Sequence, residues 1–159
     1  MVILILNNIL KNASIVGLGE TSHGSKEIFL MKHRLLKFLY QKMGFDIFSM
    51  EASMVDSYKL NEYVLEGKGN PKKMLGDLGF WTWNTKEVLE MIKWMGRENQ
   101  EGNQHNKIQF TGFDMQSPQS AVDEIQSKVL LAESFSLRKK IDSLKRYPKN
   151  TDLRNKIVD

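Results

Sequence analysis

The chain has 159 residues and a net charge of +4, with 41% hydrophobic and 26% charged residues, which is typical of one soluble globular domain rather than a fibrous or disordered protein. It contains no cysteine, which excludes disulfides, Cys-ligated zinc and a thiol nucleophile. Its basic residues cluster at 138–146, where a solvated helix face is favoured over a nucleic-acid-binding patch, so no nucleic-acid partner is expected.

Apolar residues recur at helical spacing in residues 1–12, which predicts an amphipathic helix. This run is too short to span a bilayer and lacks the features of a signal peptide, so we expect a soluble, cytoplasmic protein without membrane partners. Residues 13–20 predict a short buried strand that ends in a glycine-rich loop. A long helix is expected over residues 25–43, with Ser25 as its N-cap and Gly44 just after its end. Its expected apolar stripe consists of Ile28, Met31, Leu35, Leu36 and Leu39.

Aromatic and β-branched residues over 45–51 predict a second strand, and residues 107–112 predict a third. Asn84 or Thr85 is expected to cap the helix that precedes this third strand. The helices expected after the second strand cover residues 54–66, 71–78, 86–99 and 118–144, with a final helical piece at the C-terminus.

This alternation predicts one α/β domain over residues 1–159, with a parallel-sheet βαβ core and helices on both faces. Three strands make a thin sheet, and residues 121–159 are polar and helical without a further strand. We therefore expect this chain to form the N-terminal part of a larger fold.

Each predicted strand ends in polar side chains. Glu20 and His23 follow the first strand, Glu51 ends the second and Asp114 follows the third. Because ligands bind at the carboxyl ends of parallel strands, these four side chains are expected to meet at one edge of the sheet.

The function of each of these groups has a simpler structural alternative. Glu20 and His23 are three residues apart, so the carboxylate can fix the imidazole tautomer and raise its basicity, but the same turn could merely cap a helix. Glu51 is costly to bury without a partner, and Arg34 could pair with it in a structural ion pair. Asp114 could simply belong to a turn.

Helical spacing allows only one of His33 and Arg34 to face the strand ends. Arg34 is favoured because its guanidinium can bind a carboxylate bidentately. His33 is expected at the surface or in an interface, and His105 in a solvent-exposed turn.

The loop that contains Trp81, Trp83 and Asn84 is expected beside the site. Its aromatic rings could form an apolar wall for a ligand or could equally anchor the core. We include these three residues with Asp114 and Gln116 as candidate substrate-binding residues.

Five blocks of sequence in this order resemble the erythromycin esterase family. They are Gly-Leu-Gly-Glu-Thr-Ser-His-Gly at 17–24, Lys-His-Arg-Leu-Leu-Lys-Phe-Leu at 32–39, Met-Gly-Phe-Asp-Ile-Phe-Ser-Met-Glu-Ala-Ser at 43–53, Trp-Thr-Trp-Asn-Thr-Lys-Glu-Val at 81–88 and Phe-Thr-Gly-Phe-Asp-Met-Gln at 110–116. The resemblance covers about the first 120 residues.

The resemblance implies a metal-independent hydrolase of carboxylic esters that needs no cofactor. His23 would be the general base that draws a proton from water, and this water would attack an ester or macrolide lactone carbonyl. Hydrolysis of a macrolide lactone would imply a role in antibiotic resistance. Glu20 and Glu51 would orient the base and the water, and Arg34 would pair with a carboxylate. The expected partner is a small-molecule ester or lactone.

Two features of this chain depart from the family. Family members are more than twice as long, and a second catalytic histidine comes from their later part, so the 159 residues alone are expected to be incomplete. Many relatives also have no known macrolide substrate. The alternatives are a metal- or haem-binding module built from Glu20, His23 and Glu51, and a catalytically inactive fragment.

Overall fold

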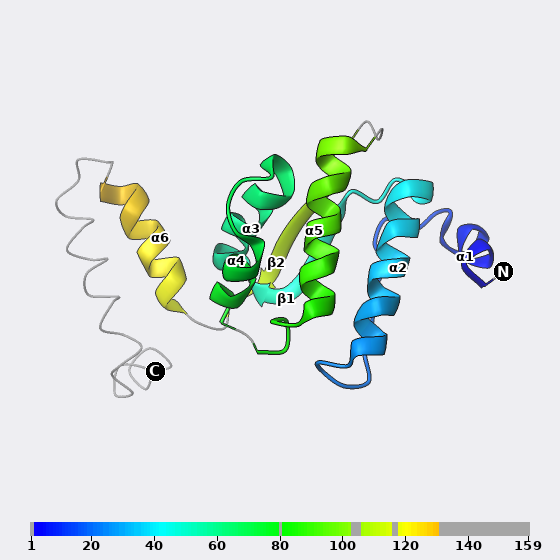
Figure 1. Cartoon of the computed structure of the whole chain (residues 1–159), viewed down its shortest axis with the longest axis horizontal. Helices are drawn as coiled ribbons and strands as arrows, with labels where there is room; N and C mark the ends of the chain where they lie inside the picture. The colour runs from blue at the N-terminus through cyan, green and yellow to red at the C-terminus, as the bar shows by residue number, and fades with distance from the viewer. Residues whose placement is uncertain (1, 80, 103–105, 116–117, 131–159) are drawn as a thin grey trace, which may run out of the picture.

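The computed structural model describes residues 2–79, 81–102, 106–115 and 118–130, and Figure 1 shows their arrangement. Its elements in chain order are α1 (Val2–Leu10), α2 (Lys26–Met43), β1 (Ile47–Ser53), α3 (Met54–Glu66), α4 (Pro71–Asp77), α5 (Lys86–Glu101), β2 (Gln109–Asp114) and α6 (Pro118–Leu130). Every helix expected within these residues is present. The helical continuation expected after residue 130 lies outside the described residues.

The helix boundaries follow the capping signals in the sequence. Thr85, one of the two expected caps, accepts a hydrogen bond from the Val88 amide at 3.3 Å where α5 begins. Gly44 ends α2 with a φ of 77°, a left-handed conformation that glycine adopts at little cost. Ser25 occupies the N-cap position of α2, although its side chain makes no capping hydrogen bond.

The two strands of the sheet are parallel. Ile47 pairs with Gln109 and Met50 with Gly112, and α3, α4 and α5 form the crossover between the strands. Gly112 permits this close pairing, because a Cβ atom there would collide with the carbonyl oxygens of Ala52 and Ser53. The chain therefore has the expected α/β fold with a parallel βαβ unit.

Burial alternates along β1. Phe48, Met50 and Ala52 are buried, whereas Ile47, Ser49 and Glu51 are exposed. The buried face joins a core to which α2, α3 and α5 contribute, and α5 passes in front of the strands in Figure 1. Within the described residues the helices thus cover one face of the sheet, and the expected cover of the second face is not seen there. No helix in this part of the chain is long and apolar enough to cross a membrane.

The first predicted strand is wrong. Residues 13–20 form no strand, and within the described part of the chain β1 pairs only with β2. A strand needs a neighbour within about 4.8 Å for its backbone hydrogen bonds, and a cavity lined by both segments lies between residues 14–20 and β1. Ile15, which was expected to be buried, is 88% exposed. Residues 13–20 therefore have the composition of a strand but lack a partner strand among the described residues.

Candidate active site

A cavity of about 720 Å³ lies beside the open edge of β1. Its walls are residues 14–20, one face of α2 and β1, together with single side chains from a later loop (Trp83), from α5 (Met91) and from β2 (Phe113). Glu20, His23 and Glu51 all line it. The sequence-predicted meeting of these three side chains is therefore found in the structure, although the first of the three segments is not a strand.

Glu20 connects His23 to α2. One of its carboxylate oxygens, Oε1, pairs with Nδ1 of His23, and the other, Oε2, accepts a hydrogen bond of 2.6 Å from Nζ of Lys32. Burial alone would raise the pKa of Glu20, but the hydrogen bonds from Lys32 and His23 outweigh it and lower the pKa below its ordinary value. Glu20 is therefore an ionised carboxylate at neutral pH, held between two donors.

Trp83 forms a buried wall next to His23. The two rings meet edge to face with centroids 5.9 Å apart, and Trp83 is only 4% exposed. Its Nε1 donates a hydrogen bond of 2.8 Å to the carbonyl oxygen of Glu51. This one side chain thereby links the strand end at Glu51 to the imidazole.

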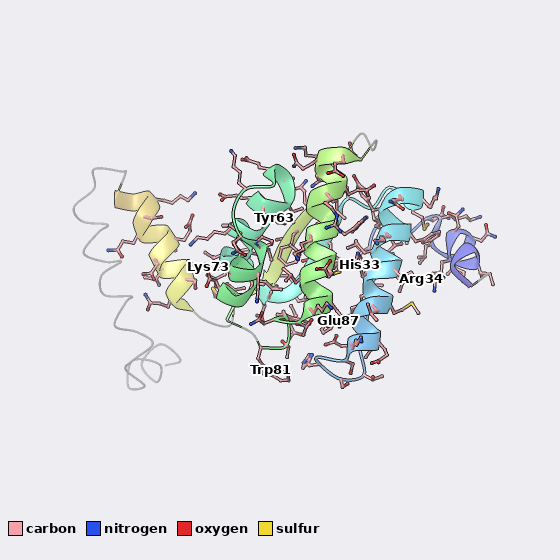
Figure 2. All side chains as sticks on the ribbon, in the orientation of Figure 1. His33, Arg34, Tyr63, Lys73, Trp81 and Glu87 are labelled. Carbon is pink, nitrogen blue, oxygen red and sulfur yellow. The ribbon has the colours of Figure 1, made fainter. Side chains whose placement is uncertain are left out.

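The expected role of Arg34 is not seen in the structure. Arg34 is exposed on the side of α2 that points away from α5 (Figure 2), and it forms no ion pair with a described residue. Lys32 pairs with the Glu20 carboxylate instead. It lies three residues after the buried Phe29 and four before the buried Leu36, and therefore on the same face of the helix. Of the expected apolar stripe, Leu36 and Leu39 are buried, whereas Met31 is 50% exposed and was wrongly included.

His33, which was expected at the surface or in an interface, is half-buried between α2 and α5 within the chain (Figure 2). Its ring lies 5.5 Å from that of Trp94, and its Nε2 atom is buried without a hydrogen-bond partner among the described residues. Burial and the positive charges of Lys37 and Arg97 lower the pKa of His33 to about 4. His105 lies outside the described residues.

Among the described residues, the remaining predicted ones do not line the cavity. Asp114 ends β2 on the far side of β1, where it pairs in register with Ser53 and accepts a hydrogen bond from the Met115 amide. Trp81 is 75% exposed, and Asn84 is also exposed. Gln116 lies outside the described residues. Phe113, the neighbour of Asp114, does line the cavity, and successive side chains of a strand point to opposite faces, so equal positions at strand ends did not place all three carboxylates together.

Lys32, Phe29 and Phe113 line the cavity but were not predicted. Helical spacing from Phe29 could have identified Lys32, whereas nothing in the sequence singled out Phe113.

In the described ranges, no group of three or more His, Cys, Asp or Glu side chains is arranged to hold a metal ion.

A model of the erythromycin esterase family matches residues 40–146 of this chain. The chain belongs to the erythromycin esterase family. Its relatives include YbfO of Bacillus subtilis (strain 168), which is named as a candidate hydrolase and is 32% identical over 112 residues, 70% of this chain and 24% of that protein. Erythromycin esterase type II of Escherichia coli is 29% identical over 110 residues, 69% of this chain and 25% of that protein.

Two solved structures resemble this erythromycin esterase family member. One is named a succinoglycan biosynthesis protein, with 41% identity and a TM-score of 0.69 over 80% of this chain and 32% of that chain. The other, from Bacillus cereus, has 34% identity and a TM-score of 0.72 over 87% of this chain and 33% of that chain. The chain thus spans about a quarter of the length of the curated relatives and a third of the solved ones.

Proposed function

We propose that this chain supplies the water-activating part of a metal-independent hydrolase site, with His23 as the general base. The observation that carries this proposal is the pairing of His23 Nδ1 with Glu20 at the wall of a cavity that Glu51 also lines. Family membership supports hydrolysis as the reaction, because relatives are named hydrolase and esterase.

The Glu20 pairing determines which nitrogen of His23 can act as a base. An ionised carboxylate only accepts hydrogen bonds, so Nδ1 carries the proton and Nε2 keeps its lone pair. Nε2 takes a proton from water while the water oxygen bonds to the ester carbonyl carbon. As the carbon–oxygen bond of the leaving group breaks, the imidazolium returns that proton to the alkoxide. Lys32 keeps Glu20 ionised throughout, whereas Arg34 was the residue expected to pair with a carboxylate.

The cavity suits a small-molecule ester or lactone. Its volume of about 720 Å³ lies within the range of about 300–1,000 Å³ that small-molecule sites occupy. Trp83 and Phe29 supply an apolar wall, and Glu51 places a second carboxylate at the strand end to orient water. Trp83 therefore fits the predicted apolar wall better than Trp81.

A chimera tests this proposal. The matched 110 residues of Escherichia coli erythromycin esterase type II are replaced by those of this chain, and hydrolysis of erythromycin and simple aryl esters is measured. We expect activity that is unaffected by chelators, with kcat/KM lowered by about 10²–10⁴-fold in His23→Gln. Activity retained in that variant, or a folded but inactive chimera, would contradict the proposal. Nitrogen chemical shifts of His23 in the unfused chain give an independent check, since we expect the proton on Nδ1.

A further inference from the structure

The cavity beside β1 has two chemically different ends. Glu20, His23 and Lys32 gather at one end, and Trp83 links the carbonyl of Glu51 to the same end. Among the described residues no charged side chain lines the other end. Its apolar walls are Ile15, Val16, Leu36, Leu39, Phe45 and Ile47. A ligand that extends across the cavity therefore passes from the reacting groups into aliphatic surroundings.

The two long walls, α2 and β1, both run from the polar end to the apolar end. On α2, Lys32 belongs to the polar end, and the carbonyl of Leu39 accepts a hydrogen bond from the amide of Phe45, just before β1. On β1, Ile47 begins the strand and Glu51 lies near its other end. Helical rise places Leu39 about 10 Å from Lys32, and strand rise places Ile47 about 13 Å from Glu51. The two walls thus agree on the length of the cavity.

The apolar end has surface that a ligand can bury. Ile15 is 88% exposed and Ile47 is 61% exposed, whereas Leu36 and Leu39 are buried. Each methylene of a ligand that is removed from water there should tighten binding by about fourfold. A charged group placed at this end would lose its hydration without gaining a partner. The apolar end therefore favours an uncharged aliphatic group.

The position of His23 determines which part of an ester reaches the apolar end. The carbonyl carbon has to lie beside the water that His23 activates, so the acyl and alcohol groups point in different directions from this place. The His23 side chain is 55% exposed, whereas α2 and β1 flank the path towards Ile47. The alcohol, which has to leave, is best placed on the exposed side. The acyl group then lies between α2 and β1.

We propose that the substrate is an ester of an uncharged aliphatic acid, straight or branched, whose acyl chain of about eight to ten carbons runs from His23 to Ile47. Carbon–carbon bonds of about 1.5 Å advance an extended chain by about 1.3 Å per carbon, so this chain spans about 10–13 Å. The acyl preference rests on the proposed ester hydrolysis at His23. It adds Ile15 and Ile47 as residues that set the preferred acyl length.

Binding of uncleaved analogues to the chain tests the acyl pocket independently of catalysis. N-Methyl alkanamides keep a neutral carbonyl, and their acyl length is varied in titrations followed by amide chemical shifts. We expect the dissociation constant to fall about two- to fourfold per added methylene until about eight to ten carbons, with the largest shift changes around Ile15 and Ile47. A terminal carboxylate on the ten-carbon amide should weaken binding at least tenfold. Affinity that does not depend on length, or shift changes confined to residues outside the cavity, would overturn the acyl pocket.

Matched variants locate the far end of the pocket. Ile47→Asp places a charge there and should weaken the ten-carbon amide at least tenfold more than the four-carbon amide. Ile47→Val keeps an apolar, β-branched side chain and should retain the length preference. Ile9→Asp, at a 67% exposed position on α1 outside the cavity wall, should change neither affinity. Equal weakening of both amides in a folded Ile47→Asp variant would contradict the proposed position of the acyl chain.

The erythromycin esterase chimera separates the acyl preference from the catalytic proposal. We expect kcat/KM for a p-nitrophenyl octanoate to exceed that for the acetate at least tenfold. His23→Gln should lower both values by the same factor. Equal values for the two esters, or a preference for acetate, would overturn the acyl preference and leave His23 as the base. A chimera that hydrolyses neither ester would contradict the catalytic proposal, and the amide titrations would still decide whether the aliphatic pocket exists.

Discussion

Nζ of Lys32 lies 2.6 Å from Oε2 of Glu20, while the other oxygen of that carboxylate pairs with His23. The Lys32 and Glu20 side chains are only 15% and 13% exposed, so water screens their attraction less than at an open surface. Lys32 on α2 thus holds the Glu20 carboxylate in position, and this carboxylate in turn orients the His23 imidazole. Lys32 acts through Glu20 and is a positioning residue.

Replacing Lys32 in the erythromycin esterase chimera tests whether Lys32 positions His23 through Glu20. Lys32→Met removes a hydrogen bond that lowers the pKa of Glu20, so that pKa rises. A protonated Glu20 no longer holds His23 in the basic tautomer. We expect kcat/KM to fall about tenfold, equivalent to about 1.4 kcal/mol, and the acid limb of its pH profile to move to higher pH. Lys32→Arg should restore most of the activity, and a profile unchanged in Lys32→Met would show that Lys32 is merely structural.

His33 should make stability depend on pH. Its pKa is about 4 in the folded chain and close to 6.5 when unfolded, so the unfolded chain binds more protons between these values. The free energy of unfolding should therefore fall as pH drops from about 6.5 to about 4, by on the order of 2 kcal/mol for this half-buried ring. Urea unfolding of His33→Gln should show a smaller loss over this window. Equal losses in both proteins would contradict the prediction.

Gly112 should be intolerant of a side chain. A Cβ atom there would meet the carbonyl oxygens of Ala52 and Ser53 and the hydroxyl of Ser57, none of which is the end of a long flexible side chain. Gly112→Ala should lower the free energy of unfolding by about 1–3 kcal/mol or more. Gly17→Ala is the control, because a Cβ atom there meets nothing within 4 Å. Equal effects of the two substitutions on thermal unfolding would refute the close approach of the strands.

The two tryptophans of the loop should differ in their contribution to stability. Trp83→Phe removes the donor to the Glu51 carbonyl and part of a buried ring, which should cost about 1–2 kcal/mol. Trp81→Phe, at a position that is 75% exposed, should change stability by less than about 0.5 kcal/mol. Denaturant midpoints of the two variants give the comparison, and the reverse order would contradict the assignment of Trp83 as the buried wall.

Local patterns determined the helices and the two strands of the described region. Caps such as Thr85 and Gly44 act within one turn of backbone, so their effect can be recognised without knowing the fold. The pairing of Glu20 with His23 is also local, since the two residues are three apart on one turn. The sequence by itself was therefore sufficient to predict this pair and the α/β class.

Only the tertiary structure decided what lies beside these elements. Residues 13–20 have the composition of a strand, but a strand exists only where another backbone accepts its hydrogen bonds, and here a cavity adjoins them. Lys32 rather than Arg34 reaches Glu20 because packing on α5 sets the rotation of α2. Asp114 does not line the cavity, whereas Phe113 does, because pairing with β1 turns only one face of β2 towards the cavity. Each of these results depends on contacts between segments far apart in the chain, which local composition does not encode.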